Sequence, residues 1–238
     1  MSAGILRALS TGGRGMMVSG IPWLNGESRE MHVSALGSNI LCTRHNNALS
    51  SLDAAAADVV SYLRADQVDL ERMEEGHSFT LVSGALWERW MLKLLLGGMA
   101  SGSLGRDGRT IDEWAPDVNE DGLIEVLFYG ADFPTETGMA IREEQPPPEA
   151  TPDEVGVTGL SSSSQGGLIG VALAVGVLEI ALSVVPLSGI LRRRVGLVRV
   201  LRTEPPVEKM VAFAWATSNT DVVDLTRHEG TPPSPQAT

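Results

Sequence analysis

The apolar positions after residue 50 recur with the period of an α-helix. They fall at i, i+4, i+7, i+8 and i+11, which places them on one helical face: Leu52, Ala56, Val59, Val60 and Leu63. Ser50 is a suitable N-cap, and Asp53 follows it at the spacing of a capping box. The pattern predicts an amphipathic helix that begins at Ser50. The acidic run 66–75 either finishes this helix or follows it as a solvated connection.

A second helix is predicted from about Ser83 to Gly97, where apolar residues cover most of the surface. Its polar edge is narrow and consists of Glu88, Arg89 and Lys93. A helix of this kind lies mostly in the interior, so we expect its two tryptophans to pack in the core and its polar edge to form an exposed stripe. The alternative for the stripe is contact with an anionic partner or with the acidic run. The buried side is predicted to comprise Leu86, Trp87, Trp90, Met91, Leu94 and Leu95.

Further along the chain the period changes to two, which is typical of strands. This alternation predicts strands at 123–129, 195–201 and 210–216, and an extended segment at 30–42. Residues 142–166 contain three consecutive prolines, several acids and four serines, a composition typical of a linker or loop.

Residues 168–190 allow two interpretations. They form a stretch of 23 residues with one charge, Glu179, followed by three arginines, and this length would span a bilayer as a helix. However, apolar residues alternate with Glu179, Ala181 and Ser183, which favours a buried β-hairpin broken near Gly176. An ionisable group at mid-membrane costs about 3 kcal/mol on insertion scales. We therefore expect the hairpin, with a single membrane span as the alternative.

These elements predict an α+β fold in which an N-terminal helical part packs on a C-terminal, mostly antiparallel sheet. The expected regions are a helical part ending in a strand (1–141), an acidic linker or loop (142–166), a β-rich region (167–228) and a disordered tail (229–238). The N-terminus lacks the apolar core of a signal peptide, and one cysteine excludes an internal disulfide framework. We expect a cytoplasmic protein.

The net charge of −12 is concentrated in the middle of the chain. Residues 65–155 carry 20 acidic and 6 basic residues, whereas the two flanking regions are close to neutral. Binding to a phosphate backbone requires Lys and Arg to displace counterions. The charge therefore disfavours a nucleic-acid partner and favours a protein partner, with a membrane contact through 168–190 as the alternative.

Cys42 and His45 are separated by two residues, a spacing that lets a thiolate and an imidazole reach one zinc ion from a tight turn. A structural zinc site needs four ligands, and His32, His77 and His228 are the candidates to complete it. The alternative is that Cys42 packs as a small apolar residue while His45 and Asn46 hydrogen-bond the turn before the helix.

The run from residue 41 to 53 (LCTRHNNALSSLD) resembles the Cys-x-x-His/Cys-Asn-x-x-Leu-Ser-x-Leu-Asp stretch of a group of bacterial and phage proteins related to HNH endonucleases. Residues 88–93 (ERWMLK) look like a second segment of that group, and 133–134 with 138–139 are similar to a third. The resemblance implies a mixed α+β fold. It also implies that His45 and Asn46 lie near a metal and take part in catalysis. The sequence departs from the nuclease pattern because no Cys-x-x-Cys precedes Cys42.

Asp117, Asn119 and Asp121, followed by Gly122, match the first half of a calcium-binding loop. The carboxylate that normally closes such a loop is replaced by Phe128, so we expect weak affinity for calcium at best. The alternative is a hairpin turn at Asp121-Gly122 that leads into the strand predicted at 123–129.

No Gly-x-Ser-x-Gly elbow, Walker loop or dinucleotide fingerprint occurs in the chain. We therefore expect a non-catalytic binding or interaction protein derived from an HNH-like module. The alternatives are a metal-dependent HNH-like nuclease and a single-pass membrane protein anchored by 168–190. No cofactor is expected, with zinc at Cys42 and His45 or calcium at Asp117, Asn119 and Asp121 as alternatives.

Overall fold

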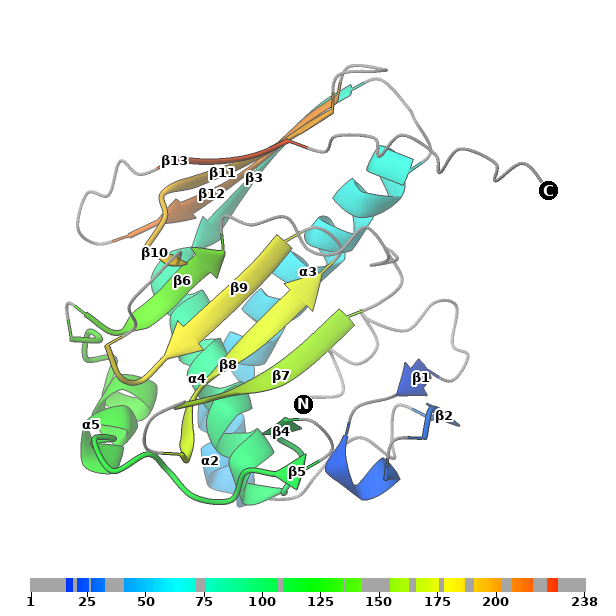
Figure 1. The fold of residues 1–238 in the computed structure, drawn as a ribbon. Coiled ribbons are helices and arrows are strands. Elements are labelled where there is room, and N and C mark those ends of the chain that lie inside the picture. The colour runs from blue at the N-terminus through cyan, green and yellow to red at the C-terminus, as the bar shows by residue number, and fades with distance from the viewer. Residues whose placement is uncertain are drawn as a thin grey trace.

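The computed structural model has an α+β fold in which helices pack against two larger β-sheets (Figure 1). The structure describes residues 16–18, 21–25, 27–32, 41–71, 76–106, 109–134, 136–142, 155–162, 166–175, 178–186, 191–202, 207–215 and 222–226. The fold class expected from the sequence is confirmed.

The two long helices are α3 (Ser50–Glu71) and α4 (Gly84–Ala100), and both were predicted from helical periodicity. The short α2 (Thr43–Ala48) precedes α3, and a 3-10 turn, η1 (Pro22–Leu24), lies nearer the N-terminus. In α4 the Ser83 hydroxyl accepts a hydrogen bond from the Leu86 N–H, an N-cap that fixes the start of the helix.

The larger sheet has five antiparallel strands in the order β10-β6-β9-β8-β7. Its central pair, β8 and β9, forms the hairpin expected within 168–190, so these residues do not form the alternative apolar helix. No helix in the described part of the chain has the length and apolarity needed to cross a membrane. The strands are β6 (Gly138–Arg142), β7 (Val155–Ser161), β8 (Leu168–Val175), β9 (Leu178–Ser183) and β10 (Leu191–Arg193).

The second sheet has four strands in the order β13-β11-β12-β3 and joins distant parts of the sequence. Its strands are β3 (Gly76–Ser83), β11 (Leu197–Arg202), β12 (Val207–Ala214) and β13 (Val222–Thr226). β11 and β12 are antiparallel, as two strands joined by a short connection must be, whereas β3 runs parallel to β12. Because β3 is the last strand in this order, it forms one edge of the sheet within the described chain. Two small ribbons complete the structure: β1 (Met16–Val18) with β2 (Arg29–Met31), and β4 (Gly105–Arg106) with β5 (Arg109–Thr110).

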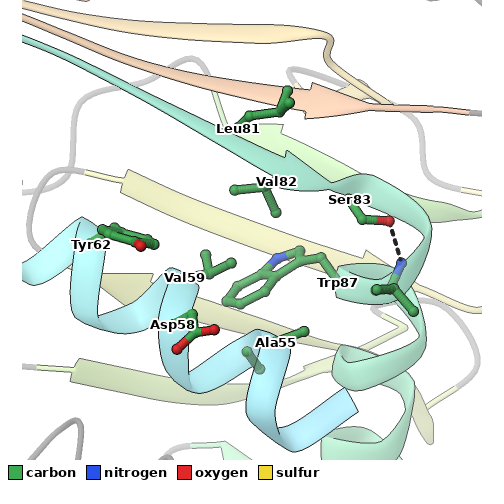
Figure 2. Close-up of a pocket in the computed structure, with 10 residues that line it drawn as sticks. Ala55, Asp58, Val59, Tyr62, Leu81, Val82, Ser83 and Trp87 are labelled. Carbon is green, nitrogen blue, oxygen red and sulfur yellow. Dashed lines mark hydrogen bonds between the residues drawn. The ribbon is translucent and has the colours of Figure 1, made fainter. Parts of the chain in front are cut away.

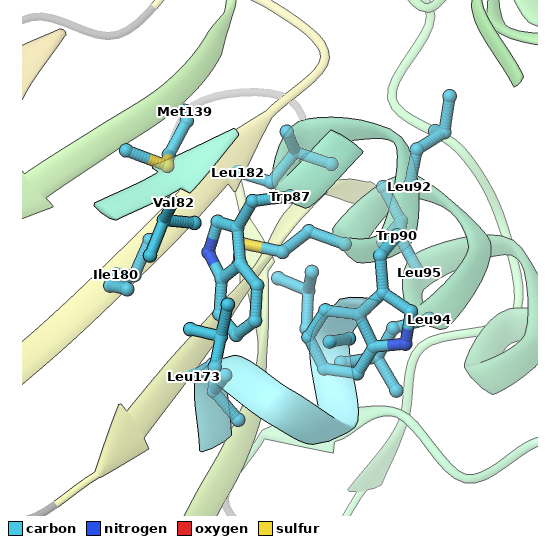
Figure 3. Close-up of a cluster of buried hydrophobic side chains, with 14 of the residues drawn as sticks. Val82, Trp87, Trp90, Leu92, Leu94, Leu95, Met139, Leu173, Ile180 and Leu182 are labelled. Atoms are coloured by element: carbon cyan, nitrogen blue, oxygen red, sulfur yellow. The ribbon is translucent and has the colours of Figure 1, made fainter. Parts of the chain in front are cut away.

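The core lies between α4, α3 and the five-stranded sheet. Figure 1 shows both helices behind this sheet, and α4 contacts β8 and β9 directly. Trp87 and Trp90 are both buried, with ring centroids 4.9 Å apart, which confirms their expected place in the core. Figure 3 shows the two indoles beside apolar side chains of α4 and of β6, β8 and β9, among them Met139, Leu173, Ile180 and Leu182.

The strand predicted at 123–129 is wrong, because these residues form α5 (Glu120–Ile124) and a π-helical turn, η3 (Glu125–Tyr129). The buried residues here are Leu123, Val126 and Leu127, at the i, i+3, i+4 spacing of a helix. The alternation of acids and apolar residues was misleading because Ile124 and Tyr129 are exposed apolar residues rather than buried ones.

Two other expectations are corrected by the structure. Strand β7 occupies 155–161, inside the segment expected to be a linker or loop, and pairs along its length with β8. The polar edge of α4 is not an exposed stripe, because Glu88 is buried and Arg89 and Lys93 are half-buried. The tail 229–238 lies outside the described residues.

Candidate binding groove

A shallow pocket of about 240 Å³ lies where α3, β3 and the start of α4 meet (Figure 2). Figure 2 shows Ala55, Val59 and Tyr62 of α3 across from Val82 of β3, with the Trp87 ring between the two elements. The walls are mostly apolar, and Asp58 is the single formally charged residue among them. The lining residues are Ala55, Ala56, Asp58, Val59, Tyr62, Leu81, Val82, Ser83, Leu86 and Trp87.

Two consecutive residues of β3, Leu81 and Val82, are among the lining residues. Their side chains point to opposite faces of the sheet, and Leu81 is exposed whereas Val82 is buried. Figure 2 shows Val82 pointing toward α3 and Leu81 pointing away from it. β12 pairs with β3 over its whole length, from Gly76 to Ser83.

The rim of this pocket exposes large apolar side chains. Tyr62 on α3 is 56% exposed, Leu81 on β3 is 68% exposed, and Leu86 on α4 is also exposed. Phe79, which is two residues before Leu81 on the same face of β3, is 61% exposed. We call the pocket together with Tyr62, Phe79, Leu81 and Leu86 the edge groove. A group of large exposed apolar side chains around a pocket is typical of an interaction site.

Trp87, one of the lining residues, carries a buried hydrogen-bond donor without an acceptor. Its indole Nε1–H is buried and has no partner among the described residues. A buried donor left unpaired costs about 1–3 kcal/mol, so native proteins rarely leave one without a reason.

Beside the edge groove, the outer face of the same sheet carries a small ionic network. Arg199 of β11 donates two hydrogen bonds to Glu208 Oε1 of β12, from Nε at 3.0 Å and from Nη2 at 2.7 Å. This guanidinium lowers the pKa of the Glu208 carboxyl, with a smaller contribution from His77. His77 Nδ1 lies 3.6 Å from Glu208 Oε2, so the network ends at the first residues of β3.

The polar edge of α4 is used to hold the fold together. Glu88 Oε1 accepts the Met139 N–H at 2.7 Å and lies 3.5 Å from Arg194 Nε, while Arg89 donates to the Leu127 carbonyl. Lys93 Nζ lies 2.6 Å from Asp53 Oδ2 of α3. Burial raises the pKa of Glu88 more than the Met139 N–H and Arg194 lower it. These contacts hold α4 against neighbouring elements, and none of the three side chains lines the pocket.

Cys42 and His45 are brought together, as their spacing predicts, but at an exposed position. Cys42 Sγ lies 3.3 Å from His45 Nδ1, and the imidazole packs edge-on against Phe128 with ring centroids 5.4 Å apart. Asn46 is exposed in α2 and donates its backbone N–H to the Cys42 carbonyl. In the described part of the chain no group of three or more His, Cys, Asp or Glu residues lies close enough to hold a metal. His32 directly follows β2, His77 is in β3, and His228 lies outside the described residues.

The calcium-like segment begins a helix. Asn119 is the N-cap of α5, and its Oδ1 accepts the Gly122 N–H at 3.2 Å. The hairpin turn expected as the alternative at Asp121-Gly122 is therefore wrong. Asp117 and Asp121 are both exposed. Because Asn119 Oδ1 already accepts this hydrogen bond at the start of α5, fewer side-chain oxygens of residues 117–121 are available as calcium ligands.

Sequence reasoning missed the edge groove because its residues come from three elements. Leu81 and Phe79 look like ordinary strand residues, and their exposure depends on which face of the sheet other elements cover. One available signal was the uncharged run 78–83, since an edge strand is usually protected by a charge or a proline. Comparison of the chain with protein-family models, curated proteins and solved structures found no match.

Proposed function

We propose that the protein is a non-catalytic interaction protein that binds another polypeptide in the edge groove. The observation that carries this proposal is that exposed Tyr62, Leu81 and Leu86 all line one mostly apolar pocket between α3, β3 and α4. Their exposure costs solubility if nothing covers them. The groove has no nucleophile paired with a base, so its chemistry is that of binding.

The polypeptide partner is favoured over nucleic acid by charge. Asp58 of α3 is the one formally charged residue among the described residues that line the pocket, and it is exposed. A phosphate backbone would be repelled by this carboxylate. Apolar side chains of a protein partner would be accepted by the rim.

Site-specific photocrosslinking tests this function. A benzoylphenylalanine is placed at Leu81, and at Tyr129 as a control, because Tyr129 is exposed but does not line the groove. We expect a discrete protein adduct from position 81 and none from position 129. The adduct should disappear when Tyr62→Lys or Leu86→Lys is introduced into the same chain. Equal labelling at the two positions, or an adduct that survives both lysine variants, would refute the proposal.

A second candidate function, the metal-dependent HNH-like nuclease, is favoured by one observation. Cys42 Sγ and His45 Nδ1 are 3.3 Å apart, as two neighbouring ligands or a ligand and a base would need to be. This function predicts DNA cleavage that depends on a divalent ion and is lost in His45→Ala. Absence of cleavage with Mg²⁺, Mn²⁺, Ni²⁺ and Zn²⁺ would exclude it.

A further inference from the structure

The pocket of the edge groove has a carboxylate and an aromatic ring side by side among its lining residues. Asp58 and Tyr62 both come from α3 (Figure 2) and are i and i+4 in that helix, so their side chains are neighbours on its surface. We propose that the pocket receives an arginine side chain of a polypeptide partner, with the guanidinium at Asp58 and Tyr62. This inference rests on the proposed interaction function and goes further by naming the residue that the partner contributes.

The carboxylate of Asp58 is available to a partner. Asp58 is exposed, and in the part of the chain that the structure describes no hydrogen bond or ion pair joins it to another residue. Other acids nearby are used by the fold, since Asp53 of α3 pairs with Lys93 and Glu208 of β12 pairs with Arg199. No lysine, arginine or histidine is among the described residues that line the pocket. The pocket therefore offers a negative charge that a cation of the partner can neutralise.

The size and lining of the pocket suit one long side chain. Its volume of about 240 Å³ lies below the roughly 300–1,000 Å³ of pockets that enclose a drug-sized ligand. Ala55, Val59 and Leu86 give the lining an apolar surface. The methylene stem of an arginine can pack on such a surface while its charged head stays near water at the exposed Asp58.

Arginine fits this pair of residues better than lysine does. A planar guanidinium donates two parallel hydrogen bonds to a carboxylate and stacks on an aromatic ring. Tyr62 is 56% exposed and lies one helical turn from Asp58, so one guanidinium can contact both side chains. The ammonium of lysine is a strongly hydrated point charge without a planar face to stack on the ring. Arginine is also among the residues that most often dominate the affinity of a protein interface.

NMR titration of the full-length, ¹⁵N-labelled protein with three capped tripeptides tests the inference. The first probe has arginine between two leucines, the second has lysine in its place, and the third has citrulline, which keeps nearly the shape of arginine but carries no charge. We expect the arginine probe to shift the amide signals of residues 55–62 and 81–87, which contain the lining residues. The lysine and citrulline probes should bind at least about fivefold more weakly.

Two substitutions with matched controls locate the guanidinium. Asp58→Asn should weaken binding of the arginine probe at least about fivefold. Asp112→Asn removes an exposed carboxylate that does not line the pocket, so it should leave binding unchanged. Tyr62→Leu should reduce the preference for arginine over lysine, whereas Tyr62→Phe should keep it because the ring remains. Circular dichroism of each variant confirms that the fold is retained.

The outcomes separate this inference from the proposed function. Groove shifts that are equal for the arginine and citrulline probes, or that survive Asp58→Asn, would refute the inference and leave an apolar polypeptide site. Absence of groove shifts with the arginine probe at millimolar concentration would also refute it, and the photocrosslinking experiment would then decide the proposed function separately. Agmatine that binds as tightly as the arginine probe would assign the pocket to a small cation instead of a polypeptide. Self-association that is lost in Asp58→Asn would replace the partner by a second copy and refute the inference.

Discussion

Glu88 of α4 and Arg194 form an ion pair at the point where the chain passes from one sheet to the other. Arg194 Nε lies 3.5 Å from Glu88 Oε1, and Arg194 itself separates β10 of the five-stranded sheet from β11 of the four-stranded sheet. The residue adopts a left-handed backbone conformation (φ 44°) and donates its N–H to the Met139 carbonyl. Its guanidinium lies 5.5 Å from the ring centroid of Trp215. The crossover between the sheets is therefore fixed by a charge, a backbone hydrogen bond and an aromatic ring.

Removing the Glu88 side chain should destabilise the protein far more than neutralising it. Glu88→Ala leaves the Met139 N–H and Arg194 without this acceptor and opens a cavity, so we expect a loss of about 3 kcal/mol. Glu88→Gln keeps an oxygen for the Met139 N–H and removes a buried charge, so its stability should stay within about 1 kcal/mol of wild type. Urea unfolding at neutral pH measures both. Equal losses of stability in the two variants would contradict the role of Glu88 as the hydrogen-bond acceptor of the Met139 N–H.

The raised pKa of Glu88 predicts a specific pH dependence. Because burial favours the protonated carboxyl, the native state binds this proton more tightly than the unfolded state. The stabilisation is fully present below the ordinary pKa of 4.5 and is lost as pH rises through the higher native pKa. Wild type should therefore lose stability relative to Glu88→Gln over this interval. Unfolding free energies of the two proteins that run parallel from pH 4 upward would contradict it.

Lys93 and Asp53 should couple the two long helices. Their 2.6 Å contact is 14% exposed on each side, so it is screened less than a surface pair. A double-mutant cycle of Lys93→Met and Asp53→Asn is expected to give a coupling free energy of about 1–3 kcal/mol. The same cycle on Arg199 and Glu208, which are more exposed, serves as a comparison and should give a smaller coupling. A zero value for the first pair would show that the helices are held by apolar packing alone.

Gly84→Ala should be destabilising although alanine is the better helix former. A Cβ on Gly84 would lie 2.7 Å from three ring carbons of Trp215, and that ring is held by its own hydrogen bond from Nε1 to the Val195 carbonyl. Forcing the ring aside should cost about 1–3 kcal/mol and change the tryptophan fluorescence. Gly156→Ala is the control, since its Cβ would make an ordinary 3.6 Å contact with Ala174. An unchanged melting temperature in Gly84→Ala would show that the ring moves freely.

Lysine substitutions at Phe79 and Leu81 should leave the stability of the protein nearly unchanged. Both side chains are mostly exposed on β3, so Phe79→Lys and Leu81→Lys should each change the free energy of unfolding by no more than about 0.5 kcal/mol. Urea unfolding measures both. A loss of more than about 1 kcal/mol in either variant would show that these side chains pack within the chain and are not available to a partner.

The parts of the fold that the sequence predicts are those with strong local periodicity. The helical face of α3 and the nearly all-apolar α4 follow directly from spacing, and so does the β8–β9 hairpin, where Ile180 and Leu182 alternate with smaller residues. The strand prediction for 123–129 failed because, over so short a stretch, the spacing of acids and apolar residues fits both the helical and the strand period. Only the Asn119 cap and the tertiary burial of Leu127 decide in favour of a helix.

The candidate site depends on non-local contacts that the sequence does not reveal. Glu88 looks like part of an exposed stripe until Met139 and Arg194 are placed beside it. Likewise, the exposure of Leu81 depends on which face of the sheet the rest of the chain covers. The close approach of Cys42 to His45 was predicted because it lies within a single turn.

The pairing of β3 with β12 has a consequence for how the protein is made. Gly76 to Ser83 leave the ribosome long before Val207 to Ala214, the strand that they join. In the nascent chain β3 therefore lacks this partner strand while more than half of the protein is still being synthesised. Contacts between such distant segments form slowly, and unpaired strands are prone to aggregate meanwhile. We expect the yield of folded protein to depend on chaperones that hold β3, and a chain that stops before Val207 to accumulate in inclusion bodies.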